Sequence, residues 1–200
     1  MFSQIENEQE ALQSLCDILA EGDKFCLAWI GYCEDDVEKT IRPIAKAGPG
    51  LGFPEGVHHS WGSADNQRCP PGLAVSTGEP CLVDDISTDS TFPSWRIVAT
   101  QAGFISSLSL PLIAHDKRGS IVDLRGTLNL FSDKRAFFDD ETVKHYTCLA
   151  SSLTHAVAAQ RRDLAEGLAF GVKSLRAGTD RRRAEEALQA AQAEWPAHHG

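Results

Sequence analysis

Side chains suited to binding a small molecule are concentrated between residues 61 and 129, where aromatic and polar residues interrupt short apolar segments. A ligand pocket needs aromatic walls and a few polar groups that orient the ligand. We therefore predict a ligand-binding site here, with no catalytic residue and no metal ligand. Its predicted members are Trp61, Arg68, Asp84, Asp85, Trp95, Arg96, Ser107, Ser109 and Asn129.

Each of these residues also has a purely structural explanation. Asp85 could cap the turn that follows it, because aspartate accepts hydrogen bonds from nearby backbone amides. Trp95 could belong to a satellite core, and Arg96 could be a surface cation. The serines and the asparagine could line an ordinary solvated sheet face.

Sequence patterns typical of enzymes are missing. The chain contains no G-x-S-x-G, no G-x-G-x-x-G and no Walker loop. The adjacent pairs His58-His59 and His198-His199 are poor metal chelates, because neighbouring side chains point apart on regular elements. We therefore expect a non-catalytic protein with no cofactor.

The six cysteines follow no CxxC, zinc or disulfide spacing, which indicates reduced and mostly buried thiols. An alternative function is a thiol redox sensor or reductase that uses Cys69 and Cys81. This alternative requires an accessible thiol with a lowered pKa.

The hydrophobic pattern predicts the elements that must position these residues. Helical spacing predicts helices over residues 3–20 and from Asp139 to about residue 176, with Gly178 and Asp180 interrupting the second before a final segment, 181–195. Residues 48–72 are rich in glycine and proline and are predicted to be irregular. Strands are expected over residues 25–33, 39–47, 81–84, 105–113 and 121–132, and short helices over residues 72–76 and around Trp95. This order predicts an α+β domain on an antiparallel sheet.

Two strands alternate in character, so the sheet should have two different faces. Ser107, Ser109 and Asn129 should share a small polar face with room for a ligand. The aliphatic residues should pack under the terminal helices; they are Leu108, Leu110, Leu112, Leu128 and Leu130. Pro43 lacks a backbone N–H and predicts that strand 39–47 lies at or near an edge.

Composition limits the compartment and the partners. The formal net charge is −9, which disfavours nucleic acid as a partner. No apolar run reaches the roughly 18 residues of a membrane span, and the N-terminus is unlike a signal peptide. We expect a cytoplasmic protein that binds neither nucleic acid nor membrane.

Several segments together resemble a GAF domain, the small-molecule sensor module of bacterial signalling proteins. They are residues 27–31 (LAWIG), the Trp61 loop, residues 72–80 (GLAVSTGEP), Asp84-Asp85-Ile86, Gly103-Phe104 and residues 126–130 (GTLNL). The similarity is greatest to GAF modules beside histidine-kinase or diguanylate-cyclase domains. It implies an antiparallel sheet with helices on one face and a ligand pocket on the other, followed by a long C-terminal helix. It also implies a GAF sensor domain over residues 1–160 and a helical linker over residues 161–200.

The chain departs from specialised members of this family. It lacks the Cys-His dipeptide of bilin-binding GAF domains, and its cysteines do not match those of GAF-type methionine sulfoxide reductases. A haem-binding GAF domain is a further alternative and would need a histidine in the pocket.

The resemblance implies a sensor that binds an unidentified small molecule and relays the change through its C-terminal helix. The apolar residues Val157, Leu164, Leu168, Val172 and Leu175 keep helical spacing and predict a homodimer through the terminal helices. A histidine kinase or diguanylate cyclase pathway is the expected partner. The alternative is a purely structural dimerisation module. Because no output domain follows, we expect a stand-alone sensor or a truncated relative of a multidomain protein.

Overall fold

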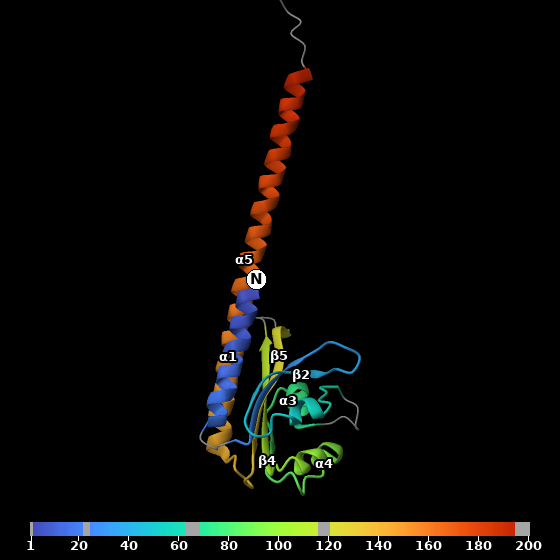
Figure 1. Cartoon of the computed structure of the whole chain (residues 1–200), viewed down its shortest axis with the longest axis vertical. Helices are drawn as coiled ribbons and strands as arrows, with labels where there is room; N and C mark the ends of the chain where they lie inside the picture. The colour runs from blue at the N-terminus through green and yellow to red at the C-terminus, as the bar shows by residue number, and fades with distance from the viewer. Residues whose placement is uncertain (1, 22–24, 63–68, 116–120, 195–200) are drawn as a thin grey trace, which may run out of the picture. The chain divides into compact units, whose positions relative to one another are not determined.

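The computed structural model describes residues 2–21, 25–62, 69–115 and 121–194, and it contains a five-stranded sheet between two layers of helices (Figure 1). In chain order the elements are α1 (Phe2–Ala20), β1 (Leu27–Cys33), β2 (Ile41–Ala47), α2 (Phe53–Gly56), α3 (Pro70–Thr77), β3 (Cys81–Val83), α4 (Pro93–Gln101), β4 (Ser106–His115), β5 (Ile121–Ser132) and α5 (Asp140–Glu194). The predicted α+β class and antiparallel sheet are confirmed.

The strands follow the order β2-β1-β5-β4-β3, and every neighbouring pair is antiparallel. β1 lies between β2 and β5, as expected for a strand that is apolar on both sides. β2 is an edge strand, as Pro43 predicts. Pro43 lies opposite Gly31, next to the point where the β1–β2 register shifts, so its missing N–H falls at an irregularity of the ladder.

The aliphatic face of the sheet is buried against α1 and the first part of α5 (Figure 1). Its buried residues are Leu108, Leu110, Leu112, Leu128 and Leu130 from the sheet, Leu12, Cys16 and Leu19 from α1, and Ala150, Val157 and Ala158 from α5. Each fully buried leucine contributes about 1.5–3 kcal/mol of transfer free energy. This layer is the main core, and it holds the sheet in place for the layer on the other side.

The second face of the sheet is covered by α2, α3 and α4. α3 begins with Pro70-Pro71, and proline suits the first turn of a helix because that turn has unpaired N–H groups anyway. A Cβ on Gly72 would lie 2.0 Å from the carbonyl oxygen of Ser60, so only glycine lets α3 approach this closely. The contact joins α3 to the segment that precedes it.

In the part of residues 48–72 that the structure describes, 48–62 and 69–72, the chain is more regular than its composition predicts. These residues contain α2, and α3 starts at Pro70 rather than at residue 72. Residues 58–62 run beside the start of β2: Ile41 N donates to His59 O at 2.8 Å, and Trp61 N donates to Lys39 O at 2.9 Å. The prediction was wrong because it counted glycine and proline as irregular, whereas these prolines begin helices.

α5 is one helix from Asp140 to Glu194, so the predicted interruption at Gly178 and Asp180 is wrong. One glycine costs a helix about 1 kcal/mol relative to alanine, and the surrounding alanine, arginine, leucine and glutamate residues favour the helix. By their contacts, residues Met1–Ala158 form one compact unit and residues Ala159–Gly200 a second. Within the described residues, no helix is long and apolar enough to cross a membrane.

Candidate ligand-binding site

The registers of the sheet place the predicted polar residues of β4 and β5 in two adjacent rows on the second face. In one row, Ser109 lies between Cys81 and Asn129, and Asn129 also pairs with Trp29 of β1. In the next row, Ser107 lies between Val83 and Phe131. Ser107, Ser109 and Asn129 therefore share one face, as their alternation predicts.

This polar face is fully buried. Ser107, Ser109, Thr127 and Asn129 are all 0% exposed, which rules out the alternative of a solvated sheet face. The Thr127 hydroxyl lies 3.1 Å from both Leu110 O and Asn129 Oδ1, and Asn129 Nδ2 lies 3.5 Å from Trp29 O. Thr127 and Asn129 are thus bonded within the sheet.

A layer of aromatic rings covers this face. Phe53 of α2 is central: its ring centroid lies 5.1 Å from that of Phe104, 5.5 Å from Phe131 and 6.2 Å from Trp95. Its neighbour His59 lies 5.9 Å from Phe53 and 4.7 Å from Trp29. Segments far apart in the sequence therefore supply one aromatic cluster.

Six buried polar atoms in this region have no hydrogen-bond partner among the described residues. They are Trp29 Nε1, Trp95 Nε1, both ring nitrogens of His59, Ser107 Oγ and Ser109 Oγ. Most buried polar groups in native proteins are paired, and an unpaired one costs about 1–3 kcal/mol. Unpaired groups gathered between the sheet and the residues that cover it are typical of a place where a ligand or water supplies the bonds.

His59 is neutral in this environment. Burial, with a smaller contribution from His58, lowers the pKa of His59 to about 3. A neutral imidazole has one nitrogen that donates and one that accepts. His59 can therefore offer one bond of each kind without bringing a charge into the layer.

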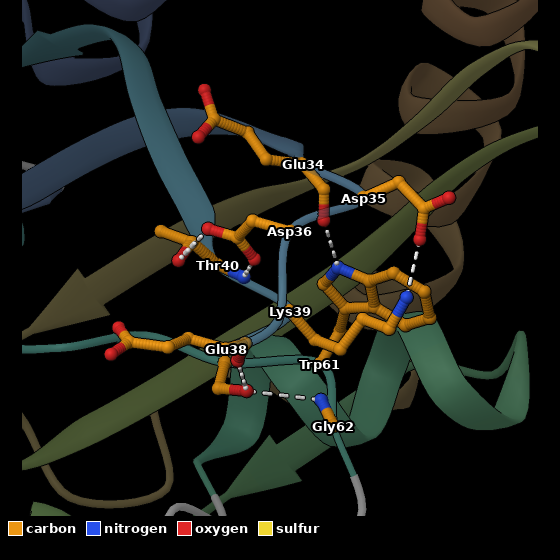
Figure 2. A network of polar contacts seen from close by, with 9 residues as sticks. Glu34, Asp35, Asp36, Glu38, Lys39, Thr40, Trp61 and Gly62 are labelled. Carbon is orange, nitrogen blue, oxygen red and sulfur yellow. Dashed lines mark hydrogen bonds and ion pairs between the residues drawn. The ribbon is translucent and has the colours of Figure 1, made fainter.

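Trp61 is partly buried against the same cluster of side chains and also anchors the segment before α3 (Figure 2). Its Nε1 donates to Glu34 O at 3.1 Å. Lys39 Nζ lies 4.8 Å and Arg125 Cζ 4.5 Å from the centroid of its ring, which places two cations against one indole. Lys39 also pairs with Asp35. These contacts hold residues 58–62, including His59, against the β1–β2 turn.

Asp85 and Arg96 both make local contacts, and those of Asp85 are the turn-capping bonds of its structural explanation. Asp85 Oδ1 accepts from Ser87 N at 3.0 Å and from Ser87 Oγ at 2.6 Å, and the hydroxyl lowers the pKa of Asp85. Arg96 Nη1 donates to Asp89 O at 2.8 Å. Arg135 Nη2 lies 2.7 Å from Asp85 Oδ2, an ion pair without the angle of a hydrogen bond.

Of the remaining predicted residues, Asp84 lies at the surface and Trp95 lies in the aromatic layer. Asp84 is exposed, and its carbonyl accepts from Ala136 N at 3.0 Å. Trp95 is buried in the aromatic layer. Arg68 lies outside the described residues. Asp85 also lines a surface cleft of about 400 Å³ with Thr100, Gly103 and Arg135, and Phe104 of the aromatic layer lines the same cleft.

The cysteines beside the site are held as thiols. Burial raises the pKa of Cys69, and burial with nearby Asp89 and Cys69 raises the pKa of Cys81 to about 12. Cys69 Sγ donates weakly to Ser60 O at 3.7 Å. A nucleophilic cysteine needs a lowered pKa, so these surroundings weigh against the thiol alternative.

Comparison with known families decides what this architecture is. The family model for the GAF domain matches residues 6–158, about three quarters of the chain. This chain belongs to the GAF domain family. The match spans the sheet, both helical layers and the buried polar face. A comparison with curated proteins gave no match.

Solved GAF-type structures share the fold at low sequence identity. The GAF domain region of a protein described as a membrane protein from Geobacter sulfurreducens PCA has a TM-score of 0.61 and 20% identity, over 78% of this chain and 96% of that one. A domain of a protein described as a two-component sensor histidine kinase from Sinorhizobium meliloti 1021 has a TM-score of 0.57 and 17% identity, over 79% and 95%. Free methionine-R-sulfoxide reductase from Neisseria meningitidis has a TM-score of 0.58 and 18% identity, over 78% and 81%. These similarities show the fold alone.

The predicted site residues of this GAF domain lack five aromatic residues of the buried layer: Trp29, Phe53, His59, Phe104 and Phe131. From the sequence, Trp29 is placed only in strand 25–33, and His59 is considered only as a metal ligand. The alternation of residues 27–31 could have indicated that Trp29 shares a face with Leu27, but its position beside Asn129 depends on the β1–β5 register. No local signal places Phe53 or His59.

Proposed function

We propose that this GAF domain is a non-catalytic cytoplasmic sensor that binds a small molecule against the second face of its sheet. GAF domains commonly serve as signalling or ligand-binding modules. The observation that carries the proposal is the group of buried, unpaired polar atoms on Ser107, Ser109, Trp29, Trp95 and His59. A ligand that supplies their missing bonds would offset the free energy that burying them costs.

Strands β4 and β5 supply a physical route from the site to α5. Ser107 and Ser109 face the site, whereas Leu108 and Leu110 of the same strand lie in the core that includes Ala150 of α5. Protein interiors are close-packed, so a shift of β4 on one face displaces the side chains packed on the other. We propose that ligand binding acts on α5 in this way.

The proposal extends to the assembly. We propose that the domain, residues 1–160, continues into a helical linker, residues 161–200, that pairs with a second copy in a homodimer. The output would be a histidine kinase or diguanylate cyclase pathway. The competing function is a structural dimerisation module, in which the buried layer has no ligand and the helical dimer forms without one.

Thermal-shift screening and native mass spectrometry of the full chain test the sensor proposal together. We expect a bound small molecule in the native mass or a compound that raises the melting temperature. The response should weaken when Ser107 and Ser109 are both replaced by alanine. Ser151→Ala, an exposed change on α5, is the matched control and should keep the response. If no compound binds and no bound mass is found, the structural dimerisation module is favoured instead.

A further inference from the structure

We infer that the buried face selects a planar, uncharged ligand that is rich in hydrogen-bond acceptors, such as a heteroaromatic ring bearing a carbonyl group. This inference rests on the proposed function, because it names the ligand class of the same site. It follows from three properties of the layer: the kind of polar atom left unpaired, the lack of charge beside them, and the aromatic rings that surround them.

More of the unpaired atoms can only donate than can only accept. Trp29 Nε1, Trp95 Nε1 and one nitrogen of neutral His59 can only donate, whereas the other nitrogen of His59 can only accept. The hydroxyls of Ser107 and Ser109 can donate or accept and so adapt to the ligand. A complementary ligand therefore presents acceptors to the two indoles and to His59, such as carbonyl oxygens or unprotonated ring nitrogens, together with one donor.

The layer carries no formal charge in the described part of the chain. Its buried members are aliphatic, aromatic or cysteine side chains, and the polar groups beneath them are hydroxyl, amide and neutral imidazole. A buried ion needs a partner of opposite charge. Lys39 and Arg125 lie against the Trp61 ring, and Arg96 Nη1 donates to the Asp89 carbonyl. An anion would also meet the negative faces of the aromatic rings.

The rings favour a flat ligand. Phe53, Phe131 and Trp95 come from three different elements, and their centroids lie 5.5–6.2 Å apart. Flat rings pack well against such a cluster in offset or edge-on arrangements. Ser107 lies directly beside Phe131 in the sheet, so a ring that stacks there has a donor at its edge.

The test uses the full chain and four planar probes that differ in charge, in hydrogen-bonding groups or in size. 2-Pyridone is planar, neutral and an acceptor; toluene is planar without an acceptor; benzoate is planar and charged; nitrate is a small planar anion. Binding is measured by thermal shift and by isothermal titration calorimetry. We expect 2-pyridone alone to bind saturably, with a rise of about 5–10 °C at a hundredfold excess over its dissociation constant.

The variant carrying both Ser107→Ala and Ser109→Ala should bind 2-pyridone about tenfold or more weakly, because two hydrogen bonds are lost. Ser151→Ala should bind like the wild type. Binding of nitrate or benzoate that depends on Ser107 and Ser109 would overturn the ligand class and leave the sensor proposal standing, as would toluene binding more tightly than 2-pyridone. Failure of all four probes, with no bound mass in the native protein, would overturn both.

Discussion

Replacing Ser107 or Ser109 with alanine should leave the ligand-free GAF domain as stable as the wild type or more stable. Each hydroxyl is fully buried and has no hydrogen-bond partner among the described residues. Removing an unpaired buried hydroxyl relieves a desolvation cost of about 1–3 kcal/mol. The void left by one oxygen, about 10 Å³, costs only about 0.2 kcal/mol at 24 cal/mol per Å³.

Thr127→Val is the matched control for these two variants. Thr127 is also buried on the same face, but its hydroxyl lies 3.1 Å from Leu110 O and from Asn129 Oδ1. Valine has nearly the same shape and removes that bond, so the free energy of unfolding should fall by about 1–3 kcal/mol. The free energy of unfolding should therefore stay the same or rise in the serine variants and fall in the threonine variant.

Urea unfolding followed by circular dichroism measures this difference. The comparison is valid where the slope with urea stays unchanged, because the change in midpoint then reports stability. Ligand-free protein should be used, confirmed by native mass. Should Ser107→Ala and Ser109→Ala each lower the free energy of unfolding by more than about 1 kcal/mol, the hydroxyls must have stable partners. The two hydroxyls would then no longer be evidence for a bound ligand.

Three further predictions use other residues. The pKa of His59 is about 3 in the folded protein and about 6.5 in the unfolded chain, so its contribution to stability is complete above pH 6.5 and declines by up to about 1.4 kcal/mol per pH unit as the pH falls toward 3. His59→Gln should therefore make the urea midpoint fall less steeply with decreasing pH than it does in the wild type. An unchanged slope of the midpoint against pH would contradict this prediction. Cys69 and Cys81 should label with a thiol reagent no faster than a model thiol at pH 7, because burial raises both pKa values; fast labelling would revive the thiol alternative. Leu164→Glu with Leu168→Glu should give monomers in analytical ultracentrifugation, and a wild type already monomeric at tens of micromolar contradicts the dimer.

The sequence predicted which strand residues share the polar face of the sheet, but it did not predict where the loop residues lie. Ser107, Ser109 and Asn129 were found because strand residues two apart must share a face. The same rule cannot orient a loop. The pocket role of Asp85 and Arg96 stays a prediction, and the contacts that the structure gives them are local, with Ser87 and with the Asp89 carbonyl.

The roles of Trp61 and His59 show why loop residues resist prediction. Both belong to one short segment, and their spacing alone would not separate them. The pairing of residues 58–62 with the start of β2 places His59 in the aromatic layer and Trp61 against Lys39 and Arg125. That pairing joins positions about 20 residues apart, and no local pattern specifies it.

Alternation and helical spacing predicted the fold class and the two faces of the sheet, because these patterns act over a few neighbouring residues, and the resemblance of several segments pointed to the GAF family. The folded structure was needed to show that the polar face is buried, that Trp29 and Phe53 join Ser107 and Ser109, and that six polar atoms there lack a partner among the described residues. These features depend on strand register and on how α2 and α4 cover the sheet. Such contacts join distant segments, so they follow from packing the whole chain rather than from any one stretch of it.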